Sequence, residues 1–257
     1  MSLWRLAKDS LVFYWRTNLG VLLTVAVSTA ILTGALVVGD SVRHSLAMMA
    51  SARLGSTELA LVAQDRFFRA ELADELAKEL QTPVAAVLQL RGLITDGNDT
   101  KRANRIEVLG VDERFFRVGG GGNPFGADEG EGIVLNEPLA AQLGVRVGDE
   151  VVLRIEKPSL MSRDLPLTPD SNLSIAFRLG VRAIATESQF GRFSLQANQV
   201  APLNVFVPLA WMQEKIAQAG EANTLLVAAN LRASLTLSRA NEAMKKRWQL
   251  ADAGLFV

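Results

Sequence analysis

Few side chains in this sequence have the types and spacing needed for chemistry. The chain has a single histidine, His44, and no cysteine, so neither a Ser/His or Cys/His nucleophile pair nor a zinc site with several such ligands is expected. Asp112 and Glu113 are adjacent carboxylates, but neighbouring residues on a strand face opposite ways, which disfavours an anchored hydrolase with a carboxylate pair. We therefore expect no enzyme activity, no metal ion and no cofactor.

Two other motifs resemble binding sites only in part. The glycine run at residues 119–122 is followed by Asn-Pro-Phe, whereas a phosphate loop needs a lysine and a serine or threonine there. We interpret it as a flexible loop. The acidic cluster of Asp128, Glu129 and Glu131 lacks the alternation of a calcium loop and is interpreted as solvated charge.

The segment at residues 188–200, SQFGRFSLQANQV, is a candidate partner-binding loop. It has no helix or strand period, and Phe190 and Phe193 flank Arg192. Exposed aromatic residues beside an arginine are typical of binding surfaces. Alternatively, both phenylalanines pack into the core beneath the loop, which is the interpretation we favour.

The charges of the chain exclude one class of partner. There are 27 basic and 27 acidic side chains, so the formal net charge is zero. No electrostatic attraction to nucleic acid follows from such a balance, and we expect no nucleic-acid partner.

Residues 19–38, LGVLLTVAVSTAILTGALVV, form an uncharged apolar run. A helix of this length spans about 30 Å, which is the thickness of the hydrocarbon core of a bilayer. A cleaved signal peptide is the alternative, because Ala50-Ser51-Ala52 resembles a cleavage site. The run is longer than a signal peptide's apolar region and lies far from that site, so we predict a retained transmembrane helix.

The flanks of the run indicate its orientation. Residues 1–18 mix aromatic and aliphatic side chains with Arg5, Lys8 and Arg16, which predicts an interfacial helix on the membrane surface. Three basic residues precede the run and two, Arg43 and Arg53, follow it closely. This small excess places the N-terminus in the cytoplasm and the main domain outside it.

Small residues recur along one face of the predicted membrane helix. Ala26, Ala30 and Gly34 are four residues apart and therefore share a face, which allows close approach of another helix in lipid. Such residues are also common in membrane helices generally, so the interpretation as a packing face stays open. The sequence has no second apolar run long enough to span a bilayer, so a partner helix would come from elsewhere.

The helical pattern continues beyond the apolar run as a stalk. Apolar side chains recur at helical spacing through Val42, Leu46 and Met49, and Gly55 is a stop signal. A rigid stalk would transmit motion or position between the membrane and the domain that follows.

Residues 56–257 are predicted to form an α+β domain. Two βαβ-like units, which commonly pair into one sheet, are predicted at residues 58–63, 66–80 and 84–94 and at residues 224–230, 235–250 and 254–257. Between them lies a β-rich insertion, about 104–210, with strands at 105–111, 177–185 and 203–207 and a strand–helix–turn–strand segment at 133–155.

Four segments resemble permeases of the MacB, LolC/LolE and FtsX-like type. They are RTNLG at residues 16–20, GVDERFF at 110–116, VLNEPLAAQLGVRVGDEVVL at 134–153 and NVFVPLAWMQ at 204–213. The order of elements, a membrane helix followed by strand, helix and strand, carries most of the resemblance, which covers nearly the whole chain.

The resemblance implies an architecture and partners. Such permeases have a first membrane helix, an extracytoplasmic core domain and three further membrane helices, and they work with an ABC-type ATPase and as two membrane halves. The predicted division is an interfacial helix at residues 1–18, a membrane helix with its stalk at 19–55 and a domain at 56–257, which the resemblance identifies as a MacB-like core domain. Because the sequence stops at Val257, we expect a C-terminally truncated permease whose ATPase contacts lie in parts not present here.

The expected function is therefore that of a permease subunit in a bacterial inner membrane. It would couple ATPase-driven motion to an extracytoplasmic transport or mechanotransmission task, with an ATPase, a second permease subunit (the same or a different one) and the lipid bilayer as partners. The alternative is a single-span, membrane-anchored binding or sensor module without transport activity.

Overall fold

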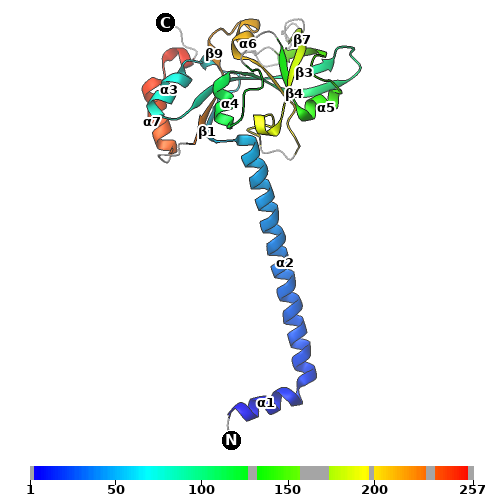
Figure 1. Cartoon of the computed structure of the whole chain (residues 1–257). Helices are drawn as coiled ribbons and strands as arrows, with labels where there is room; N and C mark the ends of the chain where they lie inside the picture. Colours follow the sequence, from blue (N-terminus) through cyan, green and yellow to red (C-terminus); the bar gives the residue numbers. More distant parts are fainter. Residues whose placement is uncertain (1–2, 127–131, 157–173, 197–199, 230–234, 254–257) are drawn as a thin grey trace, which may run out of the picture. The chain divides into compact units, whose positions relative to one another are not determined.

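The computed structural model describes residues 3–126, 132–156, 174–196, 200–229 and 235–253 (Figure 1). The chain forms two units, residues 1–50 and residues 51–257.

The first unit is helical. Helix α1 (Leu3–Phe13) and helix α2 (Trp15–Leu54) are separated by Tyr14 alone. Among the described residues, α2 is the one helix that is long and apolar enough to cross a membrane. It begins four residues before the uncharged run at 19–38 and ends directly before Gly55, which has a φ of +55°. The predicted glycine stop is confirmed.

An open sheet forms one part of the second unit. Strand β10 (Thr224–Ala228) lies between β1 (Thr57–Val62) and β3 (Val84–Asp96) and is antiparallel to both. The strands of the two predicted βαβ-like units are thus joined in one sheet, as expected. Helices α3 (Leu72–Leu80) and α7 (Leu237–Arg247) lie side by side on one face (Figure 1) and share an apolar core with it.

Strand β3 also belongs to a closed barrel. Beyond its pairing with β10, it pairs with β4 (Arg102–Val111) on one side and with β6 (Glu150–Glu156) on the other. The ring continues through β8 (Asn204–Pro208), β5 (Ile133–Asn136) and β7 (Ser174–Ala185), which pairs with β6. The β-rich insertion is therefore built onto a strand of the α+β frame and shares it.

Three short helices cover the barrel and the second face of the open sheet. They are α4 (Glu113–Gly119), α5 (Glu137–Leu143) and α6 (Leu209–Lys215). Helices α5 and α6 pack on the apolar core inside the barrel. Helix α4 carries Phe115 and Phe116 into a separate aromatic core, where they meet Phe190, Phe193 and Phe206.

The structure corrects several predicted boundaries. The helix predicted at 66–80 is wrong in its first part, because Phe68–Arg69 form strand β2, which pairs with β9 (Glu221–Ala222). The second predicted helix, at 235–250, is shorter and is followed by a 3-10 helix, η3 (Leu250–Ala253). Helices α4 and α6 were not predicted. Residue 230 and the strand predicted at 254–257 lie outside the described residues.

Candidate functional site

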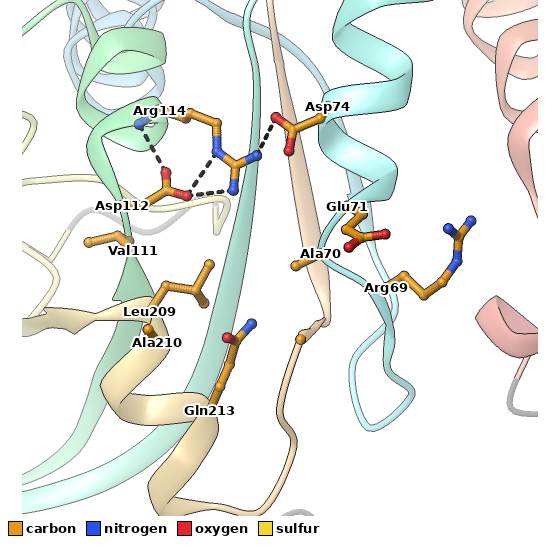
Figure 2. Close-up of a pocket in the computed structure, with 11 residues that line it drawn as sticks. Arg69, Ala70, Glu71, Asp74, Val111, Asp112, Arg114, Leu209, Ala210 and Gln213 are labelled. Carbon is orange, nitrogen blue, oxygen red and sulfur yellow. Dashed lines mark hydrogen bonds and ion pairs between the residues drawn. The ribbon is translucent and has the colours of Figure 1, made fainter.

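An open pocket of about 430 Å³ lies where the N-terminal ends of α3, α4 and α6 converge. Figure 2 shows Arg114 reaching between Asp112 and Asp74. Its Nε and Nη2 lie 2.8 and 2.6 Å from Oδ2 of Asp112, and its Nη1 lies 2.5 Å from Oδ1 of Asp74. The guanidinium therefore ties α4 to α3 through three of its five N–H donors.

The Arg114 guanidinium is kept in its charged, protonated form by this arrangement. Burial lowers the pKa of the Arg114 guanidinium, but its hydrogen bonds and charge pairs with Asp112 and Asp74 outweigh burial and raise the pKa above its ordinary value. An arginine that is always charged and bound to two carboxylates holds together the two helices that carry them. Two of the carboxylates that line the pocket, those of Asp74 and Asp112, are consequently part of a structural contact between helices.

The residues considered for chemistry are not brought together. The Asp112 side chain accepts the Arg114 N–H at 2.9 Å and caps α4, whereas Glu113 pairs with Arg117 on the exposed side of the same helix. His44 lies on α2. The acidic cluster at residues 128–131 lies outside the described residues. Within the described ranges, no three His, Cys, Asp or Glu side chains are placed to hold a metal ion.

The predicted packing face on α2 stays uncovered in this chain. Ala26, Ala30 and Gly34 are all exposed, and a Cβ built on Gly34 would meet no atom within 4 Å. The nearby threonines satisfy their hydroxyls within the helix, since Thr29 Oγ1 donates to the Val25 carbonyl oxygen at 2.8 Å. The face is therefore apolar and free of side-chain hydrogen-bond donors, and its role stays a prediction.

The candidate partner-binding loop places its aromatic side chains in the core. Phe190 and Phe193 are each 2% exposed, which contradicts the interpretation that puts them on the surface. The physical reason is the aromatic core around Phe115, whose ring centroid lies 4.8 Å from that of Phe190 and 5.2 Å from that of Phe193. Arg192, the third residue of the candidate site, is not buried and pairs with Glu187 at 3.2 Å.

A second site lies where the last turn of α2 leads into β1, and we call it the junction. The chain turns at Gly55, and the Ser56 N–H and hydroxyl both donate to the Val118 carbonyl oxygen of α4. The Ser56 carbonyl oxygen accepts the Ala229 N–H at 2.7 Å, just beyond β10. Before the turn, Arg53 donates to the Val200 carbonyl oxygen at 3.1 Å. Three separate segments thus hold one turn of chain.

Close packing at the junction depends on glycine. A Cβ on Gly55 would lie 2.8 Å from the carbonyl oxygen of Gly119 and 3.0 Å from Cε2 of Phe190, and a Cβ on Gly119 or Gly121 would overlap the segment that carries Phe190. The flexible-loop interpretation of residues 119–122 is therefore wrong for Gly119 and Gly121, while Gly120 and Gly122 face open space.

Sequence patterns predict only part of the junction. Gly55 is detectable as a helix stop. Asp112, which caps α4, and Gly120, which ends it in the left-handed region, are ordinary helix signals, and they predict a helix that begins within GVDERFF and ends just beyond it. The meeting of Gly119 with Phe190 is a contact between segments about 70 residues apart along the chain, which no local pattern encodes.

Comparisons with known proteins give the family. The sequence matches the family model of the MacB-like periplasmic core domain over residues 19–247. No curated relative matches the chain. Among solved structures, it is similar to the periplasmic region of MacB from Actinobacillus actinomycetemcomitans, with 13% identity, a TM-score of 0.46, and coverage of 76% of this chain and 83% of that one.

A second similar structure is the extracellular domain of the noncanonic ABC-type transporter YknZ from Gram-positive bacteria. The identity is 10%, the TM-score is 0.44, and the match covers 76% of this chain and 94% of that one. The family match itself includes the apolar part of α2 and nearly all of the domain. The chain therefore belongs to the family of MacB-like periplasmic core domains.

Proposed function

We propose that this chain is a permease subunit of an ABC-type transporter, in which α2 passes movement driven by the ATPase into the extracytoplasmic domain. Membership of the family gives the chain a transporter-associated role. The observation that carries the proposal is that one family match includes both the apolar helix and the domain. The partners proposed are an ABC-type ATPase and a second permease subunit, identical or different.

The geometry of α2 supports transmission of movement. At about 1.5 Å per residue, a helix of this length is about 60 Å long, twice the thickness of a hydrocarbon core. The helix is continuous from Trp15 to Leu54, and β1 begins at Thr57. Since no linker separates the helix from the sheet, displacement of the helix reaches the junction directly.

A role without catalysis fits the side chains available. One histidine and no cysteine leave few groups for acid–base or nucleophilic chemistry, and two of the three carboxylates of the pocket, Asp74 and Asp112, are bound to Arg114. We therefore propose that energy comes from a partner ATPase and that this chain supplies binding surfaces and mechanical coupling.

The proposed location is a bacterial inner membrane, with residues 51–257 outside the cytoplasm and α1 on the cytoplasmic side. Because the chain has no cysteine, single cysteines report topology without background. Ser174→Cys, on exposed β7, is expected to react with a membrane-impermeant maleimide in intact spheroplasts, whereas Ser10→Cys, on α1, is expected to react only after lysis. Reaction of Ser10→Cys in intact spheroplasts, with protection of Ser174→Cys, would overturn the orientation.

Whether the gene product associates with an ATPase distinguishes the proposed permease subunit from the alternative, a membrane-anchored sensor module. We expect the full gene product, purified from its host membrane, to retain an ABC-type ATPase and to change that enzyme's rate of ATP hydrolysis in nanodiscs. The measurement is vanadate-sensitive phosphate release with and without the gene product. Recovery of the gene product with no such ATPase, and no effect on hydrolysis when the two are mixed, would favour the anchored sensor module.

A further inference from the structure

We propose that Phe190 is a side-chain contact that, beside the sheet β1–β10–β3, holds the junction against the barrel, so that the end of α2 and the barrel move as one body. The inference rests on the proposed function only in taking α2 as the moving element. The route runs from Gly55 and Gly119, through the Phe190 ring, to two buried asparagines of the barrel.

The first contact is between the Phe190 ring and two glycines. The ring covers the backbone of Gly119 so closely that a Cβ at Gly119 would overlap Cβ, Cγ and Cδ1 of Phe190, and the ring edge lies 3.0 Å from the Cβ position of Gly55. Glycine carries an entropic cost in folding. At Gly119 its use is explained by this approach of the ring to the backbone. At Gly55 it is explained by a φ of +55° and by the Gly119 carbonyl oxygen, which would lie 2.8 Å from a Cβ.

The loop that carries Phe190 is held in one conformation. Thr186 and Gln189 form a capping box around the 3-10 helix η2 (Glu187–Gln189), and Phe190 follows with a φ of +63°, an uncommon value for a residue with a bulky side chain. The Gly191 N–H donates to the Thr186 carbonyl oxygen at 3.0 Å. A displacement of the ring is therefore passed to the backbone of the loop.

Two fully buried asparagines fasten the loop to the barrel. Asn136, at the end of β5, donates to the carbonyl oxygens of Gly191 at 3.0 Å and of Pro202 at 2.8 Å. Asn204, at the start of β8, donates to the carbonyl oxygens of Gly191 at 3.1 Å and of Phe193 at 2.8 Å. Buried hydrogen bonds of this kind are costly to break, so the loop and these strands are one rigid body.

The same asparagines also connect the loop to a helix of the barrel. The Asn136 Oδ1 accepts the Leu139 N–H of α5 and the Asn204 N–H, each at 3.2 Å. The path is therefore continuous from the turn after α2 to β5, β8 and α5. Gly55, at its start, is exposed, whereas Phe190, Asn136 and Asn204 are buried.

We call this path of contacts from the junction to the barrel the relay. Hydrogen exchange on the full chain in nanodiscs tests it without any ATPase. Gly119→Ala places a methyl group against the Phe190 ring, whereas Gly122→Ala, in the same glycine run, meets no atom within 4 Å. Gly119→Ala is expected to speed exchange about tenfold or more at the amides of Ser56 and Ala229 and also at those of Leu139 and Asn204. Gly122→Ala is expected to leave all four unchanged.

Two results would overturn the relay. One is faster exchange at Ser56 and Ala229 with no change at Leu139 and Asn204, because the junction would then loosen without the barrel. The other is an equal effect of both alanine variants. If Gly119→Ala fails to fold, Phe190→Leu, which keeps an apolar side chain but uncovers Gly119, must raise exchange at the same four amides while the amides of α3 and α7 stay protected.

A second measurement keeps the relay separate from the proposed function. Spin labels at Ser45→Cys on α2 and Ser174→Cys on β7 report the distance between helix and barrel in the gene product assembled with its ATPase. If ATP changes the distance in the parent, or leaves it unchanged in both the parent and Gly119→Ala, the relay is overturned, because α2 and the barrel then either move apart or move together without the contact. Failure of the proposed function is read separately, as the absence of any effect of the gene product on ATP hydrolysis. If ATP leaves it unchanged in the parent and changes it in Gly119→Ala, the relay is supported, because α2 and the barrel move together only when the contact is intact.

Discussion

Asp252→Asn is expected to release the segment that follows α7 and to cost about 3 kcal/mol, the lower end of the range for breaking a buried ion pair. The Asp252 side chain is fully buried, and its Oδ1 and Oδ2 lie 3.0 and 3.1 Å from Nε and Nη2 of Arg69. It also accepts the N–H groups of Arg69 at 3.1 Å and of Gln249 at 2.8 Å. We take the lower end because Arg69 keeps a 23% exposed side chain.

The loss of stability is expected to be accompanied by two local signals from the segment after α7. Trp248 packs near Phe68, with ring centroids 6.4 Å apart, so release of the segment is expected to shift the Trp248 emission to the red and to speed exchange at Gln249. The matched control is Glu79→Gln, which removes exposed ion pairs of α3 with Lys246 and Arg247 of α7, the helix just before the released segment. Exposed pairs contribute little, and a control effect as large as that of Asp252→Asn would contradict the argument.

Acidification is expected to remove the stabilisation that the ionised Asp252 carboxylate contributes. Burial raises the pKa of the Asp252 carboxyl, but hydrogen bonds from Arg69 and Gln249 and the Arg69 charge outweigh it and lower that pKa overall. A group with a lowered pKa in the folded state contributes stability that is complete above its unfolded value, about 3.9, and is lost as the pH falls through the folded value. The unfolding midpoints of parent and Asp252→Asn are thus expected to differ at pH 7 and to converge below about pH 4.

Local patterns predicted the parts of the fold that depend on local physics. The long apolar helix ending at Gly55, the strands of the open sheet and the strand–helix–turn–strand segment at 133–155 follow from periodicity and turn residues. Strand β2 was mistaken for helix because its residues have helical spacing. Its state is decided by distant groups, namely β9 and the carboxylate of Asp252.

Local patterns do not predict that the barrel closes or where the candidate site lies, because both depend on contacts between segments that are distant in the sequence. Nothing local in β3 indicates that Gly92–Asp96 will meet β6, although a Cβ on Gly92 would lie 2.5 Å from the carbonyl oxygen of Arg154. For the loop at 188–200 the favoured interpretation, that Phe190 and Phe193 pack into the core, is confirmed, and the alternative of an exposed aromatic surface is wrong. Whether a loop phenylalanine faces solvent or core is set by the cavity that other segments leave for it, here by α4 and β8.

Phe115→Ala is expected to have the second large effect, about 4 kcal/mol. Phe115 is fully buried at the centre of the aromatic core, and its ring contacts those of four other phenylalanines: Phe116, Phe190, Phe193 and Phe206. Its loss leaves a cavity between α4, the Phe190 loop and β8, which the surrounding helices and strands can fill only in part. For a domain of this size, the thermal midpoint is expected to fall by about 10 °C.

The position of Phe115 makes the variant informative about the junction as well as about stability. Helix α4 supplies the Val118 carbonyl oxygen that holds Ser56, so loosening α4 is expected to speed exchange at Ser56 before the domain unfolds. Phe177→Ala is the matched control, because it removes a partly buried ring that packs on Trp211 at 5.1 Å, on the barrel side of the domain. The control should lower the midpoint less and leave Ser56 protected. Equal loss of protection at Ser56 in both variants would mean that the turn after α2 responds to stability in general, and that α4 does not hold it in particular.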